Sequence, residues 1–376
     1  MANNKDKEIV LTTKKIKLLP WSEKYGPATI SGVLYHDKIT KSIMNYMACD
    51  KLPHLLFYGP PGCGKTTLIL AIAKHYYKDD FENMTIVLNA SEERGIETVR
   101  NRIRQFVITK GLPQNKSSPS FKLIILDEID AMTEDAQAIL RKVIEKYVSN
   151  VRFCFICNYL KKINPAIQSR CVIFRFNPIL QTDMHSYVLK ICENENITLT
   201  NKAIELIIKR SNGDMRKLLN ILQSLHMHIN FTINEEIEKN KKEEENTNNS
   251  NSSKKTQPNI KKNLLIKENS VSKILSCPTK KNIIDILECL QTKDLATSYQ
   301  IIKKIINKNG ISLLELINNI YDYLMDYILN DNKKIIKYSE QIVIEIIKKM
   351  AIINENLTYC NNENIQLISF VAIFYI

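Results

Sequence analysis

Leu55-Leu-Phe-Tyr-Gly59-Pro-Pro-Gly-Cys-Gly-Lys-Thr66 joins an apolar run to a glycine-rich loop, and this pattern is the strongest indication of the fold in the sequence. Residues 59–66 match the pattern GxxxxGK[ST], and the helical run Thr67–Tyr77 follows directly. Glycines let such a loop fold tightly, so that backbone N–H groups and the helix N-terminus surround a phosphate. The residues expected to bind a nucleotide are Gly59, Pro60, Pro61, Gly62, Cys63, Gly64, Lys65, Thr66 and Thr67.

A second motif, Leu123-Ile-Ile-Leu-Asp127-Glu128, ends an apolar run in two carboxylates. Beside a phosphate loop, Lys65 supplies a positive charge to the β- and γ-phosphates, while Thr66 and Asp127 are oxygen ligands suited to Mg²⁺. We expect Glu128 to act as the base that polarises the attacking water. The alternative is that Asp127 and Glu128 are only solvated acids at a strand end.

Three further polar residues lie where they can meet the γ-phosphate of a nucleotide. Asn158 follows the apolar run Val151–Cys157, where an asparagine either orients water or simply forms a turn. Arg170 follows a short helix that begins near Pro165, and Arg216 opens a later helix. A guanidinium stabilises charge on a transferring phosphoryl group, but by position alone each arginine is equally well a surface ion-pair partner.

Apolar runs that alternate with helical patterns predict an α/β fold with a parallel sheet covered on both faces. The expected strands are Leu55–Tyr58, Thr85–Leu88, Leu123–Leu126, Val151–Cys157 and Cys171–Phe176. From Thr182 to His228 the pattern is purely helical, and it is helical again from Lys280 to Ile376. Between these parts, Glu235–Lys262 has two apolar side chains, so we expect a disordered insert there.

Composition excludes several other classes of protein. The chain has 376 residues, 44% of them hydrophobic, which predicts two or three packed domains. Its most apolar stretch, Ile365–Ile376, is shorter than the roughly 18 residues of a membrane span, and its charged N-terminus is unlike a secretory signal. Cys154 and Cys157 lie in an apolar run and are expected to pack in the core. A net charge of +13 favours an anionic partner.

The chain resembles the small subunits of replication factor C, the sliding-clamp loader of the AAA+ class. The similarity runs from Leu19-Pro-Trp-Ser-Glu-Lys-Tyr to the last helix, interrupted only by the insert. The strings that carry it are Leu52-Pro-His-Leu-Leu-Phe-Tyr, Leu88-Asn-Ala-Ser-Glu-Glu-Arg-Gly-Ile96, Asp130-Ala-Met-Thr-Glu-Asp-Ala-Gln137, Asn158-Tyr-Leu-Lys-Lys-Ile163 and Ser211-Asn-Gly-Asp-Met-Arg-Lys217. Two of them, with Pro165-Ala166, are most similar to one particular small subunit.

The resemblance implies an AAA+ P-loop ATPase module (1–178), a helical lid (179–232), the insert (233–270) and an all-α collar (271–376) that joins five subunits. It further implies a nuclear ATPase that uses ATP and Mg²⁺ to open the sliding clamp PCNA and load it on primer-template DNA in replication and repair. Asn158 then matches sensor 1, Arg216 matches sensor 2, and Arg170 matches the finger that reaches a neighbouring subunit's ATP. A structural subunit with little turnover, or another AAA+ machine, is the alternative.

For DNA, the candidates lie on the helix that follows Ser91. Arg94 sits near the N-terminus of this helix, and Arg100 and Arg104 share one of its faces, while Arg102 points elsewhere. Ion pairs with Glu93 or Glu97 are the alternative for these side chains. Contacts of this kind would bind the DNA backbone without reading its sequence.

Two departures from the family pattern concern the nucleotide site. The family's Tyr-Arg-Pro is Tyr25-Gly26-Pro27, so a basic side chain near the adenine pocket is missing. The usual threonine of the phosphate loop is Cys63, whose side chain we expect to point away from the phosphates with little effect. The usual Asp-Glu-Ala-Asp is Asp-Glu-Ile-Asp130, which keeps both acids.

Overall fold

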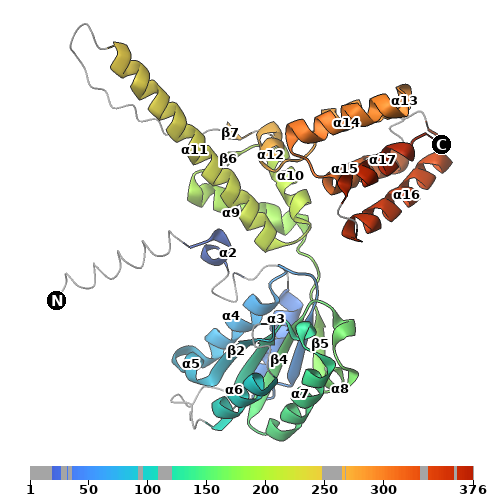
Figure 1. The fold of residues 1–376 in the computed structure, drawn as a ribbon. Helices are drawn as coiled ribbons and strands as arrows, with labels where there is room; N and C mark the ends of the chain where they lie inside the picture. Colours follow the sequence, from blue (N-terminus) through green and yellow to red (C-terminus); the bar gives the residue numbers. More distant parts are fainter. Residues whose placement is uncertain are drawn as a thin grey trace. The chain divides into compact units, whose positions relative to one another are not determined.

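The computed structural model describes residues 19–26, 32, 36–91, 96–108, 121–247, 265–266, 268–330, 338–359 and 362–375. Contacts divide the chain into two compact units. The first contains residues 1–197 and 204–227, and the second contains residues 198–203 and 228–376. Figure 1 traces the elements of each unit along the chain.

A sheet of five parallel strands forms the centre of the first unit. Its strands are β1 (His54–Tyr58), β2 (Thr85–Asn89), β3 (Lys122–Asp127), β4 (Val151–Cys157) and β5 (Cys171–Arg175). They lie in the order β2-β3-β4-β1-β5, and every pair is parallel. All five predicted strands are confirmed. Because parallel strands end at the same edge, the residues after β1, β3 and β4 come together there.

The sheet is apolar on both faces because helices cover both (Figure 1). Leu55 and Phe57 of β1 belong to a core with α3 (Asp37–Ala48) and α4 (Lys65–Tyr77). Leu56, between them in sequence, belongs to the opposite core with α6 (Ile96–Ile108) and α7 (Glu134–Tyr147). The alternation explains why these strands read as continuous apolar runs. Three short helices complete this part: α2 (Trp21–Lys24), α5 (Phe81–Met84) and α8 (Pro165–Gln168).

The helical segment after β5 comprises α9 (Gln181–Glu195), α10 (Asn201–Ser211) and α11 (Met215–Thr247). Here one boundary of the sequence prediction is wrong. The expected disordered insert begins at Glu235, yet the helix runs on to Thr247. Glu and Lys are good helix formers, and an established helix extends at low cost, so a segment whose one apolar residue is Ile237 remains helical. Residues 248–264 of the insert lie outside the described residues.

The same interval also contains two short elements of the second unit. β7 (Leu265–Ile266) pairs in parallel with β6 (Thr198–Leu199), and α12 (Glu268–Ile274) follows. The disordered insert expected over 233–270 is therefore too long, because parts of this range are helix or strand. Strands of two residues carry no periodicity, so the sequence gives no signal for them.

Five helices build the rest of the second unit: α13 (Lys280–Thr292), α14 (Leu295–Asn309), α15 (Leu313–Asn330), α16 (Glu340–Tyr359) and α17 (Glu363–Ala372). The helical prediction for Lys280–Ile376 is confirmed in the described residues. Leu316, Ile320, Ile346 and Phe370 are fully buried in its core. Other apolar side chains of this unit are exposed, among them Leu314, Tyr321, Ile344 and Ile352. No helix in the described ranges is long and apolar enough to cross a membrane.

The Cys154 and Cys157 thiols are buried in β4, as expected for core packing. Burial raises the pKa of Cys157 to about 12, so this thiol stays protonated at neutral pH. Within the described part of the chain, no cluster of three or more His, Cys, Asp or Glu side chains forms a metal site.

Stability should fall below neutral pH because of His54 on β1. Its Nδ1 accepts the backbone N–H of Phe153 (3.2 Å), and burial, aided by the charge of Arg152, lowers the pKa of His54 to about 4. In the unfolded chain the His54 imidazole binds a proton near pH 6.5. The contribution of neutral His54 to the free energy of unfolding is therefore complete above that pH and is lost as the pH falls toward 4. We expect about 2 kcal/mol less stability at pH 5 than at pH 7.

Denaturant unfolding at both pH values, followed by the fluorescence of Trp21, measures this loss. Trp21 is the only tryptophan of the chain and is buried in the unit that contains His54. The variant His54→Gln keeps an acceptor but has no group that titrates, so its stability should change less between pH 7 and pH 5. Equal pH dependence in the variant and the wild type would contradict the assignment to His54.

Candidate nucleotide site

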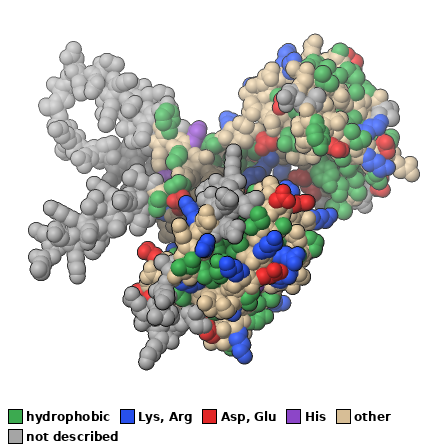
Figure 2. All heavy atoms as spheres, turned by 60° about the horizontal axis from the view of Figure 1, so that its bottom comes forward, with side chains coloured by type: hydrophobic (Ala, Val, Ile, Leu, Met, Phe, Trp, Pro, Cys, Tyr) green, Lys and Arg blue, Asp and Glu red, His purple; other side chains and the backbone are tan. Residues whose placement is uncertain are grey.

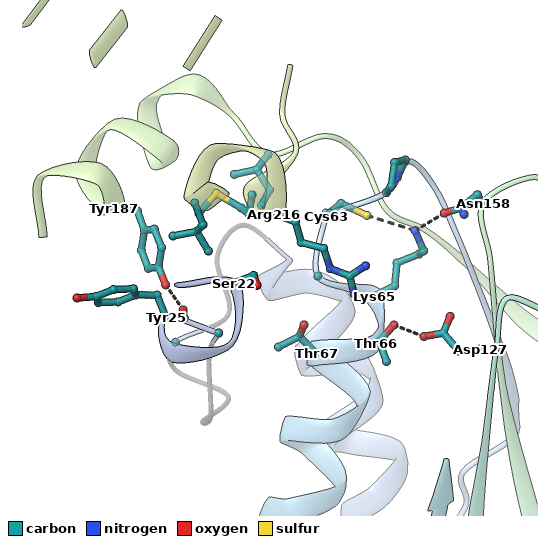
Figure 3. A pocket seen from close by; sticks show the side chains of 18 of the residues that line it. Ser22, Tyr25, Cys63, Lys65, Thr66, Thr67, Asp127, Asn158, Tyr187 and Arg216 are labelled. Carbon is teal, nitrogen blue, oxygen red and sulfur yellow. Dashed lines mark hydrogen bonds between the residues drawn. The ribbon is translucent and has the colours of Figure 1, made fainter. Parts of the chain in front are cut away.

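A pocket lies at the edge of the sheet where β1, β3 and β4 end (Figure 3). The phosphate loop forms its floor, and it joins β1 to α4. The other walls come from the segment before α3, the ends of β2, β3 and β4, and helices α9 and α11. Its lining includes Pro61, Gly62, Cys63, Gly64, Lys65, Thr66, Thr67, Asn89, Asp127, Glu128, Asn158 and Arg216.

The start of the loop requires glycine because the backbone of the next segment passes very close. Gly59 has φ +151°, and a Cβ placed there would lie 2.2 Å from the carbonyl oxygen of Phe176. Phe176 in turn donates its N–H to the Tyr58 carbonyl (2.8 Å). The end of β1 and the residue after β5 are thereby held together, and the loop turns sharply into α4.

Lys65 lies in the pocket with only 7% of its surface exposed. Its Nζ donates to the carbonyl oxygens of Gly59 and Pro60, both at 2.8 Å, and to Oδ1 of Asn158 at 3.0 Å. The loop thus fixes the ammonium group at the floor of the pocket, with the Asn158 amide beside it. This arrangement brings together two residues that are far apart in sequence, as predicted.

Thr66 and Asp127 also meet. The Thr66 hydroxyl donates to Oδ2 of Asp127 (2.7 Å), and both residues line the pocket (Figure 3). Mg²⁺ prefers oxygen ligands and retains several waters, so a hydroxyl and a carboxylate at one rim of a pocket fit its coordination chemistry. These side chains are the donors that would hold the ion.

Glu128 follows Asp127 at the pocket and is exposed to it. Its backbone is left-handed (φ +55°, ψ +38°), a conformation uncommon for residues other than glycine. Oδ1 of Asp127 accepts the N–H of Glu128 (2.9 Å). The Asp127 carboxylate thus contacts Thr66, while the Glu128 side chain is an exposed part of the pocket lining.

Sequence reasoning missed Asp130 as a residue that positions Asn158. One oxygen of Asp130, Oδ2, accepts the backbone N–H groups of Asn158 and Tyr159, both at 3.2 Å. Asp130 thereby links the turn after β3 to the end of β4. The signal that could have found it is its place as the fourth residue of the string Asp-Glu-Ile-Asp.

Arg216 lines the pocket from the first turn of α11 (Figure 3). By position alone the sequence left Arg216 open between a phosphate contact and a surface ion pair, because more than 140 residues separate it from the phosphate loop. The structure brings both to one pocket. Arg216 is thus the only guanidinium among the residues that line this pocket in the described chain.

The wall opposite the sheet was not predicted from the residues. Ser22, Tyr25, Gly26 and Tyr187 line it. The Tyr187 hydroxyl donates to the Tyr25 carbonyl, and Glu195 accepts from both Lys24 and the Tyr25 hydroxyl. These contacts attach the N-terminal segment to α9.

Gly26, which stands where the family has arginine, belongs to this wall. A Cβ at Gly26 would lie 3.3 Å from the Ser22 carbonyl oxygen, and the backbone has no positive φ there. A side chain at this position would need only a small shift of its neighbours.

Cys63 lies beside the pocket floor, where its Sγ accepts from Nζ of Lys65 (3.9 Å), so the expectation that its side chain points away from the phosphates stays a prediction. Its thiol is 1% exposed, and Sγ donates to the Pro60 carbonyl (2.9 Å). Burial raises the pKa of this thiol. The Cys63 carbonyl accepts from Nε2 of His36 (3.2 Å), whose pKa burial lowers, so a neutral imidazole from the start of α3 supports the loop.

Arg170 does not line the pocket of its own chain. Its guanidinium donates to Glu145 and to the Ala166 carbonyl, each at 2.6 Å, and Glu145 also accepts from Arg141 (3.1 Å). The side chain is about one-third exposed. Arg170 therefore lies apart from Lys65, Asn158 and Arg216, which line the pocket of its own chain.

The candidate DNA contacts are only partly described. Arg94 and the side chain of Arg100 lie outside the described residues, while α6 carries exposed Arg102 and Arg104. On the face that Figure 2 presents, Lys and Arg side chains alternate with acidic and apolar ones. The DNA contacts therefore stay a prediction.

A P-loop after an inner strand, acids at the end of β3, an asparagine at the end of β4 and an arginine from the following helices together define an AAA+ ATPase. Family models agree: residues 55–179 match the AAA ATPase family, residues 188–227 the RCF1/5-like AAA+ ATPase lid domain, and residues 278–373 the replication factor C C-terminal domain. The chain belongs to the replication factor C subunit family, and it is an AAA+ ATPase of the clamp loader of DNA replication.

Curated relatives match along nearly the whole chain. Replication factor C subunit 5 of Homo sapiens is 36% identical over 96% of this chain and 93% of its own length. The probable subunit 5 of Caenorhabditis elegans is 37% identical over 97% of this chain and 89% of its own. Subunit 3 of Saccharomyces cerevisiae is 35% identical over 93% and 90%. These names agree with the particular small subunit to which the sequence pointed, numbered 5 in one nomenclature and 3 in the other.

Proposed function

We propose that this chain binds MgATP in the pocket and, as part of the multi-subunit clamp loader, uses its hydrolysis to load PCNA on primer-template DNA. The proposal includes a nuclear location and a role in both replication and repair. The observation that carries it is the meeting of Lys65, Thr66, Asp127 and Asn158 in one pocket through direct hydrogen bonds. Each of these side chains has a separate role in phosphoryl transfer, described in the next paragraph.

In this proposal the chain mainly positions reactants and stabilises charge. Lys65 and the backbone N–H groups of the loop bind the β- and γ-phosphates, while Thr66 and Asp127 hold Mg²⁺, which neutralises phosphate charge when bound. Asn158 orients the attacking water and Glu128 accepts its proton, as a bond forms to the γ-phosphorus and the bond to the β,γ-bridging oxygen breaks. Arg216 stabilises the charge that spreads over the transferring group.

The partners follow from groups outside the pocket. Arg170, away from its own site, acts on the ATP of an adjacent subunit in a hetero-pentamer joined by the collars. Arg94, Arg100 and Arg104 bind the DNA backbone without regard to sequence, which suits a machine that must act at any primer end.

Copurification tests the assembly. Full-length chain with an affinity tag, expressed in its own cells, should capture four related ATPase subunits, and PCNA should join when a poorly hydrolysed ATP analogue is added. Primer-template DNA should bind this complex with an affinity that falls as salt rises. Recovery of the chain alone, or of PCNA at equal levels with and without nucleotide, would contradict the proposal.

The alternative is a structural subunit that binds nucleotide but turns over little. The side chains in the pocket favour turnover, because Glu128 lies free to meet water. Glu128→Gln in the reconstituted complex separates the two: an active site predicts a lower rate of ATP hydrolysis by the complex. Unchanged hydrolysis and clamp loading would favour the structural role.

A further inference from the structure

The phosphate loop and the lid touch each other directly at Gly62. A Cβ placed on Gly62 would lie 1.7 Å from Oδ1 of Asp214 and 2.3 Å from its Cγ. The Asp214 carboxylate therefore occupies the space that any side chain at position 62 would need. The next backbone N–H, that of Met215, donates to the Gly62 carbonyl (3.2 Å). Two independent contacts thus seat the start of α11 on the middle of the loop.

The same carboxylate fixes the first turn of α11. Oδ1 of Asp214 accepts the backbone N–H of Arg216 (2.8 Å) and of Lys217 (3.1 Å), and the Asp214 carbonyl accepts from Leu218 (3.0 Å). This is the geometry of a helix N-cap. Because Arg216 is the second residue of the helix, the cap determines where its backbone starts and hence how its side chain enters the pocket.

A third contact holds this turn from the side of the chain that links β5 to α9. Gly213 has φ +81°, and a Cβ placed there would lie 2.6 Å from Cβ of Pro178. The Gly213 carbonyl accepts the N–H of Ile179 (3.3 Å), and Ile179 itself lines the pocket. The turn at Gly213 and Asp214 is therefore packed against the loop and against the hinge segment of the lid.

We propose that Asp214 is a positioning residue that docks the lid on the phosphate loop and sets Arg216 in the pocket, with Gly62 as its receptor. The absence of a side chain at position 62 then leaves room for the Asp214 carboxylate of the lid as well as for the tight turn of the phosphate loop. The proposal rests on the role given above to Arg216. It extends that role by naming the contact that joins the lid to the phosphate loop.

Hydrogen exchange of the full chain without nucleotide tests the docking itself. Asp214→Ala should speed exchange of the amides in residues 215–218 roughly 2- to 30-fold, the range set by loss of an N-cap. Gly62→Ala should speed the same amides, because the new methyl group displaces the carboxylate. In the double variant, Gly62→Ala should add little to Asp214→Ala. Asp214→Asn should restore protection, because its amide oxygen accepts the same N–H groups.

Asp294→Ala is the matched control. Asp294 caps α14 in the second unit, where its side chain accepts from the N–H of Thr297 (3.3 Å). Loss of this cap should speed exchange at α14 and leave residues 215–218 as they are in the wild type. Exchange at 215–218 that is unchanged in Asp214→Ala or in Gly62→Ala would overturn the proposal, as would fully additive effects in the double variant.

Turnover by the reconstituted complex separates positioning from a purely structural role. Asp214→Ala should lower the kcat of this subunit with little change in KM, Asp214→Asn should restore it, and Asp214→Ala should add no loss to Arg216→Ala. A further loss in that double variant would overturn the positioning role. If Arg216→Ala leaves turnover unchanged, the proposed function of Arg216 fails, while the exchange results still decide whether Asp214 docks the lid.

Discussion

Lys65→Ala is expected to weaken ATP binding by this subunit roughly 10- to 100-fold. The ammonium group lies on the pocket floor, held by two loop carbonyls and by Asn158, so its charge is already placed for the phosphates. Substitution removes charge-assisted hydrogen bonds without moving any other ligand. Titration of the full chain with a fluorescent ATP analogue measures the loss.

Lys74→Ala is the control for this experiment. Lys74 lies on the same helix, is exposed and does not line the pocket, so its removal changes the net charge equally. It should leave affinity within about twofold of wild type, the effect of about 0.4 kcal/mol on binding. Equal nucleotide affinity in Lys65→Ala and the wild type would refute the assignment of the phosphate loop.

Arg170→Ala should leave ATP binding by its own chain intact and slow hydrolysis in an adjacent subunit by a factor on the order of 10³, the scale of an arginine that stabilises phosphoryl transfer. The structure supports action on another chain because Arg170 lies outside its own pocket and is held by Glu145 and the Ala166 carbonyl. Single-turnover hydrolysis in the reconstituted complex, with the other sites inactivated, measures the effect at each neighbour.

Arg141 provides the matched comparison, because it is an exposed arginine that pairs with the same carboxylate of Glu145. Arg141→Ala should leave hydrolysis within about twofold of wild type, since an exposed ion pair contributes little. A defect of Arg170→Ala that is confined to the subunit carrying the substitution would refute action in trans.

Strands and helices could be predicted where the pattern of apolar residues in the sequence matches the side chains that are buried in the structure. All five strands could be placed from their apolar runs, and α4 could be placed from the helical run that follows the phosphate loop. The end of α11 could not, because a run of Glu, Lys and Asn with Ile237 as its one apolar residue is compatible with both a disordered segment and an exposed helix. Composition alone does not separate these two states.

The phosphate-binding half of the site was predictable because its residues follow local motifs. Lys65, Thr66 and Asp127 meet as expected. The partners in contacts made by tertiary packing could not be predicted from sequence spacing. Asp130 beneath Asn158 and Asp214 over Gly62 join residues 28 and more than 150 positions apart, and only the folded backbone places them together.

The inward position of Cys63 has a practical consequence for anyone handling this enzyme. Alkylating reagents and mild oxidants attack thiolates that solvent can reach, whereas this sulfur is protonated and enclosed by the loop that carries it. Among the cysteines of the described residues, Cys49 is the exposed one and would react before Cys63. We therefore expect that ATP hydrolysis does not depend on the redox state of the surroundings, although the phosphate loop contains a cysteine.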